Sequence, residues 1–430
     1  MTPNKATAGK PVSDQVESNT LERYRLGRLQ VGQTDSYDRH LVLDHAVSLE
    51  HASHRERFEA VARSLRDLLT QRWLLTEQTY ERANAKRVYY LSMEFLIGRT
   101  LVHNIINMGV EQLVRDDLRS DPRQDWTEVI DSEPEETDKK RFAEWLRSAS
   151  GQIVDPATIF DCQVKRIHEY KRQLLNVLHI VMLYDRLRID PNLDIPPRTV
   201  LFAGKAAPAY TLAKLIIRLI NEVGAKIDAD PAMRQRLKVV FVPNYGVTLA
   251  ERLIPASDLS EQISTAGYEA SGTGNMKFMM NGALTIGTRD GATIEMAEEA
   301  GEENFFLFGL TADQVASSRG SYDPNWHYHN EPATRTALDL IFTDHFSHDE
   351  PGVFEPIRQA LLTHGDYFMH LAHLSAYAQA QAAVGSLYQD TAAWTRKAII
   401  NVGCSGKFSS DRTIAEYAAN IWKANAVPVS

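Results

Sequence analysis

The stretch Thr199-Val200-Leu201-Phe202-Ala203-Gly204 decides the fold class of the longer part of the chain. Its β-branched and aromatic residues predict a buried strand, and the closing glycine predicts a tight turn at the end of that strand. A helical pattern follows over residues 210–223, and a second apolar strand follows over 238–242. Helices are also predicted over 171–187 and 249–254. Strands that alternate with helices in this way indicate an α/β fold, in which helices cover both faces of a parallel sheet.

The rest of the chain divides by composition. Residues 1–20 are polar and are expected to be a frayed tail. Apolar residues spaced three and four apart predict a helix over 47–87, and the aromatic and β-branched segment 87–98 is expected to form a buried strand. Residues 131–140 are charged and interrupted by proline, which is typical of a surface linker. The segment after residue 359 is expected to be mostly helical.

The composition excludes several classes of protein. Of the 430 residues, 43% are apolar and 24% are charged, as in globular proteins, and the net charge of −9 argues against general binding of nucleic acid or of acidic membranes. Two cysteines cannot form a disulfide framework, and we see neither a membrane helix nor a signal peptide, so we expect a cytoplasmic protein. No metal site is predicted, because no cysteine or carboxylate pattern joins the histidine pairs His327 and His329, His345 and His348, and His370 and His373.

A glycine-rich turn precedes a lysine in Glu269-Ala270-Ser271-Gly272-Thr273-Gly274-Asn275-Met276-Lys277. Backbone N–H groups at the start of a helix attract phosphate, so this turn suits the phosphate of a cofactor. Lys277 lies about one helical turn further on, where its amine could form a Schiff base with an aldehyde if apolar surroundings lower its pKa. The alternative is an ordinary turn that precedes a helix with a solvated lysine.

Basic residues are concentrated in Lys165-Arg166-Ile167-His168-Glu169-Tyr170-Lys171-Arg172. If Lys165, Arg166 and Lys171 converge in the fold, they supply charged donors for one or two phosphates. The alternative is a solvated basic start of a helix.

Taken together, these motifs resemble the α-glucan phosphorylases, the family of glycogen, starch and maltodextrin phosphorylases. The cofactor region of that family is similar to residues 238–310 of this chain. The motifs that carry the resemblance lie in the family's order along the chain: Tyr89–Phe95, Gln163–Gln173, Gly204–Pro208, Ser260–Gly267, Glu269–Lys277, Asn281–Thr288, Asp290–Ala292, Glu299–Asn304 and Ser405–Arg412.

The resemblance implies a role for each of these site residues. Lys277 would carry pyridoxal 5′-phosphate as a Schiff base, and Lys165 with the backbone amides of Thr273 and Gly274 would hold the cofactor's phosphate. Arg166 and Lys171 would bind the substrate phosphate as part of the catalytic machinery. The glucosyl unit would be bound by Glu269, Ser271 and Gly272.

The same resemblance implies an activity and its partners. The family catalyses the reversible phosphorolysis of terminal α-1,4-glucosidic bonds of an α-glucan, which consumes inorganic phosphate and yields α-glucose 1-phosphate. The phosphate of the cofactor relays the proton in this reaction. A homodimer is a further expectation, because the family is commonly dimeric.

The resemblance also implies a domain organisation with an internal truncation. The family has two Rossmann-like domains in the GT-B arrangement, whereas this chain lacks the glycine-rich Gly-Asn-Gly-Gly-Leu-Gly-Arg loop and most of the N-terminal domain. We therefore expect impaired catalysis, and the alternative is an inactive cofactor-binding remnant or interaction protein. The expected parts are a disordered tail (1–20), an N-terminal phosphorylase fragment that is mostly helical (21–130), a linker at the deletion junction (131–141) and a C-terminal Rossmann-like cofactor-binding domain with a doubly wound parallel sheet (142–430).

Overall fold

A computed structural model describes residues 36–47, 51–89, 108–109 and 138–429. The predicted tail at 1–20, residues 90–98 of the predicted strand and residues 131–137 of the predicted linker lie outside the described residues. The chain divides into two compact units. One comprises residues 1–133 together with 414–430, and the other comprises residues 134–413.

The larger unit is built on a sheet of six parallel strands in the order β3-β2-β1-β4-β5-β6. The chain runs outward from β1 to β3 and then returns to add β4 on the other side of β1. The predicted doubly wound α/β fold is therefore confirmed, and its topological switch point lies between β1 and β4. The strands are β1 (Ile159–Val164), β2 (Arg198–Ala203), β3 (Leu237–Val242), β4 (Leu259–Gln262), β5 (Leu284–Gly287) and β6 (Phe306–Leu307).

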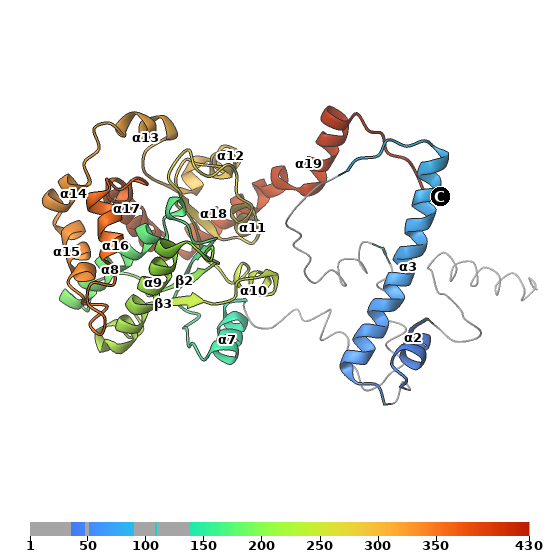
Figure 1. Cartoon of the computed structure of the whole chain (residues 1–430), viewed down its shortest axis with the longest axis horizontal. Coiled ribbons are helices and arrows are strands. Elements are labelled where there is room, and N and C mark those ends of the chain that lie inside the picture. Colours follow the sequence, from blue (N-terminus) through green and yellow to red (C-terminus); the bar gives the residue numbers. More distant parts are fainter. Residues whose placement is uncertain (1–35, 48–50, 90–107, 110–137, 430) are drawn as a thin grey trace, which may run out of the picture. The chain divides into compact units, whose positions relative to one another are not determined.

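Strand β2 shows how both faces of the sheet are covered, because alternate side chains of a strand point to opposite faces. Val200 and Phe202 join the larger apolar core, and Leu201 and Ala203 join a second core. Figure 1 shows helices of the two cores on either side of β2 and β3. The larger core contains α8 (Gln173–Ile189), α9 (Thr211–Ala229), α15 (Pro332–Phe342), α16 (Glu355–Arg358) and α17 (His370–Tyr388), and the second contains α7 (Asp138–Ser150), α10 (Val247–Leu253) and residues of α11 (Gly274–Met280).

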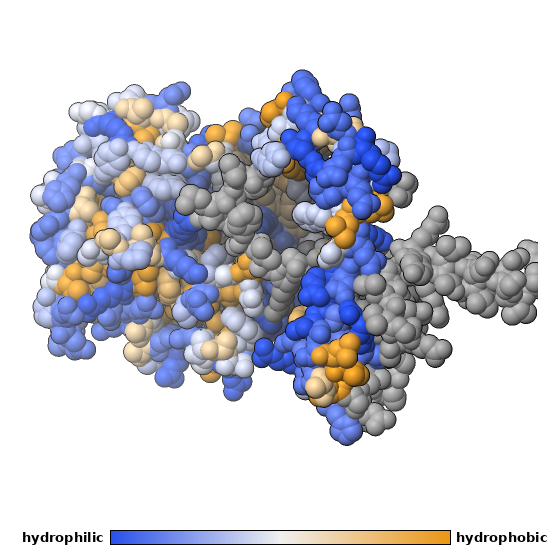
Figure 2. All heavy atoms as spheres, turned by 45° about the vertical axis from the view of Figure 1, so that its right-hand side comes forward, coloured by the Kyte–Doolittle hydropathy of each residue, from blue (hydrophilic) through white to orange (hydrophobic). Residues whose placement is uncertain are grey.

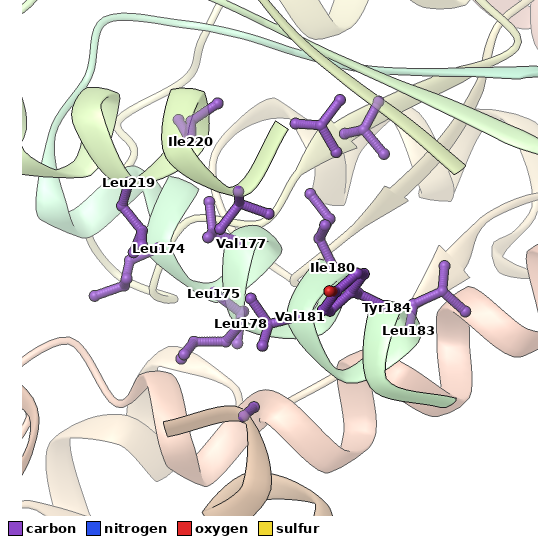
Figure 3. Packing of buried hydrophobic residues seen from close by; sticks show 14 of the residues in the cluster. Leu174, Leu175, Val177, Leu178, Ile180, Val181, Leu183, Tyr184, Leu219 and Ile220 are labelled. Atoms are coloured by element: carbon purple, nitrogen blue, oxygen red, sulfur yellow. The ribbon is translucent and has the colours of Figure 1, made fainter. Parts of the chain in front are cut away.

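Helix α8 is the centre of the larger core. Its apolar side chains point to several sides of the helix, and those of Leu219 and Ile220 on α9 lie beside them (Figure 3). A helix that is apolar all round must be buried, and α8 is enclosed by α9, α15 and α17. The predicted helices over 171–187, 210–223 and 249–254 correspond to α8, α9 and α10.

Helix α7 includes the last residues of the predicted linker. Lys139 donates hydrogen bonds to the carbonyl oxygen of Thr158 at 2.6 Å and to the carboxylate of Asp258 at 2.6 Å. Residues 138–140 are therefore the first turn of a packed helix rather than extended chain.

The described residues after 359 are mostly helical, as predicted. None of the helices in the described ranges has the length and apolar composition to cross a membrane. Further α-helices that follow β5 along the chain are α12 (Ala292–Ala300), α13 (Ala312–Ser318), α14 (Pro324–Asn330), α18 (Thr391–Gly403) and α19 (Ser410–Glu416).

The smaller unit contains α2 (Ser36–Asp44) and α3 (His54–Arg82). A capping box between Ser53 and Glu56 starts α3, which corresponds to the helix predicted over 47–87. Figure 2 shows hydrophobic patches on an otherwise hydrophilic surface of the described residues, and Trp73 of α3 is 69% exposed. The predicted homodimer stays a prediction.

The strand predicted over 87–98 is wrong for its first three residues. Residues 87–89 belong to no strand, and Tyr89 is 84% exposed. An aromatic and β-branched segment indicates a strand only where a partner strand and an apolar layer are available to it.

Candidate active site at the carboxyl edge of the sheet

The switch point places the predicted site residues at one edge of the sheet. Lys165 directly follows β1, the segment with Glu269 and Thr273 follows β4, and Asp290 follows β5. Since all the strands are parallel, these three segments leave the sheet at its carboxyl edge, where doubly wound proteins bind their ligands.

Gly204, at the end of β2, allows the backbone at Lys165 to approach closely. A β-carbon at position 204 would lie 1.8 Å from the carbonyl oxygen of Lys165. The amide of Lys165 donates to the carbonyl of Ala203 at 3.0 Å, and the amide of Ile167 donates to that of Lys205 at 3.0 Å. The glycine therefore lets the sheet hydrogen bonding continue past β1 and fixes the backbone at Lys165.

Two lysines and one carboxylate meet at this edge. Lys171 forms a hydrogen-bonded ion pair with Glu269, and the amine of Lys165 lies 4.0 Å from the same carboxylate oxygen. The three side chains are 12–15% exposed. The structure thus brings together residues that are 98 positions apart in the sequence.

The two lysines differ in pKa. Burial, together with a smaller effect of the Lys171 charge, lowers the pKa of Lys165 to about 8 against the opposing effect of the Glu269, Asp290 and Glu261 carboxylates. Burial also acts on Lys171, but its hydrogen bond to Glu269 outweighs this and raises the pKa of Lys171. Both amines therefore carry a proton near neutral pH, although only narrowly at Lys165.

Helix α11 carries Lys277 one turn from its first residue, Gly274. Thr273 precedes the helix, and its side chain caps none of the helix's amides. Lys277 itself is exposed, and the structure records no hydrogen bond or ion pair of its amine with any described residue. The apolar surroundings considered for Lys277 from the sequence are therefore wrong for this chain, because its neighbours Phe278 and Met279 turn inward and Lys277 turns outward.

The other predicted site residues lie on the same three segments. Arg166 and Ser271 are exposed, and Gly272 is half-buried with a φ of +87°, a conformation that favours glycine. The carbonyl oxygen of Ser271 accepts from the amide of Ala292 at 2.8 Å. Geometry therefore joins Lys165, Lys171 and Glu269 directly. Lys277 and Thr273 lie at the same carboxyl edge, and their side chains form no hydrogen bond or ion pair with these three residues.

Comparison with known proteins gives this edge its context. Residues 94–424 match the carbohydrate phosphorylase family. The chain belongs to this family. It is 54% identical over 287 residues to the brain form of glycogen phosphorylase from Ovis aries, 50% identical over 308 residues to the glycogen phosphorylase of Synechocystis, and 47% identical over 332 residues to that of Chlamydia trachomatis.

The aligned parts cover a larger share of this phosphorylase-family chain than of its relatives. The aligned parts make up 66%, 71% and 77% of this chain but only 34%, 36% and 39% of those three relatives. The chain therefore spans little more than a third of the length of the relatives it matches.

Arg172 is a residue whose role the sequence did not reveal. In the sequence it is one of the basic residues between 165 and 172, but in the structure its side chain is fully buried. Its guanidinium donates to the carbonyls of Ile263 at 2.6 Å and Ser264 at 3.1 Å, and it contacts His373. Its hydrogen bonds therefore hold the backbone of the segment after β4 in place, and its buried guanidinium is not available to bind a phosphate. Burial lowers the pKa of Arg172 to about 9. Its φ of +57° reverses the chain direction before α8, and no sequence signal marks this.

The histidine pairs have structural partners. The ring of His370 lies 2.7 Å from the Asp366 carboxylate, His327 lies 2.9 Å from Glu331, and His345 lies 3.1 Å from the hydroxyl of Tyr184. Over the described ranges, no three histidine, cysteine or acidic side chains are grouped so as to hold a metal ion.

Proposed function

We propose that this chain binds pyridoxal 5′-phosphate through Lys277 and carries half of an α-glucan phosphorylase active site. The observation that carries the proposal is the buried cluster of Lys165, Lys171 and Glu269 at the switch point of a chain that belongs to the phosphorylase family. The relatives are named as glycogen phosphorylases, which supports glycogen or a similar α-glucan as the substrate class.

The donor set suits a cofactor that bears a phosphate. Lys165 is 12% exposed and lies where β1 ends, and its pKa of about 8 leaves it charged at neutral pH. Together with the amides of Thr273 and Gly274, which begin a helix without a side-chain cap, it would hold a phosphate group. Lys277 projects from the same helix and has no competing partner among the described residues, so its amine is available to an aldehyde.

The remaining residues suit the substrates. Arg166 and Lys171 would bind inorganic phosphate, and their charges offset the repulsion between two neighbouring phosphate groups. Glu269 would accept a hydrogen bond from a hydroxyl of the glucosyl unit, with Ser271 and Gly272 beside it. When bound, the cofactor's phosphate supplies a group that can donate and accept a proton near neutral pH.

The test of cofactor binding is reduction with borohydride. The purified full chain is incubated with pyridoxal 5′-phosphate, reduced and digested, and the label is located by mass spectrometry. We expect it on the peptide that contains Lys277, and we expect Lys277→Ala to lose it. Lys214→Ala is a matched control, because Lys214 is another exposed lysine on a helix of the same unit. A label spread equally over exposed lysines would refute the proposal.

A catalytically inactive cofactor-binding remnant is the second candidate. The observation that favours it is the exposure of Arg166, Ser271, Thr273 and Lys277, since catalysis by charged groups depends on a site from which water is excluded. Release of glucose 1-phosphate from glycogen and phosphate separates the two. We expect release that is strongly reduced relative to full-length relatives, and release at their rate would contradict the impairment.

A further inference from the structure

Asp290, which follows β5, collects the hydrogen bonds of the segment that carries Glu269. One of its carboxylate oxygens accepts from the hydroxyl of Ser264 at 2.6 Å and from the amide of Glu269 at 2.9 Å. The other accepts from the amide of Gly267 at 2.8 Å. Asp290 is 6% exposed, so its charge is compensated by these donors and by the nearby Lys165 rather than by water.

The turn that holds Asp290 also fits the same segment sterically. Gly291 has a φ of +53°, and a β-carbon there would lie 2.6 Å from the carbonyl oxygen of Ser271 and 3.0 Å from that of Glu269. The next amide, of Ala292, donates to Ser271 at 2.8 Å. Residues 290–292 therefore hold residues 264–271 through four hydrogen bonds, three of them to the backbone of that segment.

We propose that Asp290 is a positioning residue, which acts through the backbone of Glu269 to hold the Glu269 carboxylate on Lys171 and beside Lys165. The ion pair requires the carboxylate to remain in one place, and the amide of Glu269 is the nearest point at which its backbone is fixed. No other described hydrogen bond from that amide competes with Asp290.

This role has a consequence that a purely structural role lacks. Loss of the Asp290 acceptor frees Glu269, so Lys171 loses its carboxylate partner and becomes more available to an anion. Because the Asp290 carboxylate raises the pKa of Lys165, its removal favours loss of the Lys165 proton, so phosphate binding is compared at about pH 6, where Lys165 keeps its charge. Asp290→Ala should therefore tighten the binding of inorganic phosphate, whereas general loosening of the site would weaken it. This part of the inference rests on the proposed function.

The direct test needs neither phosphate nor cofactor. The full chain is labelled with acetic anhydride near neutral pH, and the acetylation rate of each lysine is read by mass spectrometry. In Asp290→Ala we expect Lys171 to react at least about threefold faster, because the loosened ion pair exposes its amine and no longer raises the pKa of Lys171. Lys139 is the internal control, because it is also ion-paired, 17% exposed and in the same unit, at 2.6 Å from Asp258.

Glu269→Gln completes a double-mutant cycle. It should raise the Lys171 rate like Asp290→Ala, and the double variant should show no further increase, because both changes remove one interaction. An unchanged Lys171 rate in Asp290→Ala, or an equal rise at Lys139, would overturn the inference. If circular dichroism shows that Asp290→Ala is unfolded, Gly291→Ala displaces the same segment and carries the same expectation. Failure of the borohydride test at Lys277 would instead reject the proposed function and leave these rates unaffected.

Discussion

Gly204→Ala should destabilise the larger unit and displace Lys165. The added methyl carbon would lie 1.8 Å from the carbonyl oxygen of Lys165, 2.8 Å from its carbonyl carbon and 3.2 Å from the side chain of Ile167. Normal contact requires about 3.5 Å, so the backbone after β1 must move by about 1.7 Å. Overpacking of this kind costs about 1–3 kcal/mol, and loss of the two hydrogen bonds between residues 165–167 and 203–205 adds about 1 kcal/mol each.

The expected loss is therefore about 3–5 kcal/mol in the free energy of unfolding of this unit, measured by urea denaturation. Labelling of Lys277 by pyridoxal 5′-phosphate should weaken in parallel under conditions where the variant is folded. Gly403→Ala is the matched control, since position 403 has helical backbone angles and no atom within 4 Å of an added methyl group. A loss below about 1 kcal/mol for Gly204→Ala would refute the argument that this glycine fixes Lys165.

Three further predictions concern buried charges. Phosphate affinity of the wild-type chain should fall as pH rises through about 8, because Lys165 loses its proton there, and calorimetry should find a weaker fall in Lys165→Arg, which stays charged. Arg172→Met should cost about 3–5 kcal/mol in urea unfolding, because it leaves buried carbonyls unpaired, whereas the exposed Arg234→Met should cost little. Burial and the neighbouring Asp161 raise the pKa of Glu261 well above its usual range. The protonated Glu261 side chain therefore contributes to the free energy of unfolding at low pH, and this contribution is lost as pH rises through the raised pKa. Glu261→Gln stays neutral, so its free energy of unfolding should decline less between about pH 5 and 8 than that of the wild type; an equal decline would contradict this.

The fold was predictable from sequence where apolar segments are long. The predicted ranges of strands β2 and β3 agree with the structure because a parallel sheet buried on both faces needs continuous apolar strands. Helix α8 also agrees closely, whereas the helix predicted over 210–223 continues to Ala229 in α9. The hydrophobic pattern does not predict strand β4, because its sequence, Leu259–Gln262, is mostly polar, although all four of its residues are buried. Its polar side chains have partners that the strand's own sequence pattern does not mark: Gln262 donates to the hydroxyl of Ser260 at 2.8 Å, and one carboxylate oxygen of Glu261 accepts from Tyr377 at 2.8 Å. A local hydrophobic pattern cannot show such partners.

The basic run shows why the site could be predicted only in part. Lys165, Lys171 and Arg172 carry the same charge within eight positions, and the sequence offers no physical ground for separating them. The fold separates them. Lys165 follows β1 at the carboxyl edge of the sheet, whereas Arg172 has a left-handed backbone and its side chain contacts Ile263 and His373. Arg172 and Asp290 thus both form hydrogen bonds to the segment after β4, Arg172 to the carbonyl of Ser264 and Asp290 to the amide of Glu269. The Glu269 carboxylate in that segment lies beside the two lysines. The charges of Lys165, Lys171 and Glu269 are thus positioned by residues outside that cluster, and the contribution of those residues depends on long-range contacts that no local motif encodes.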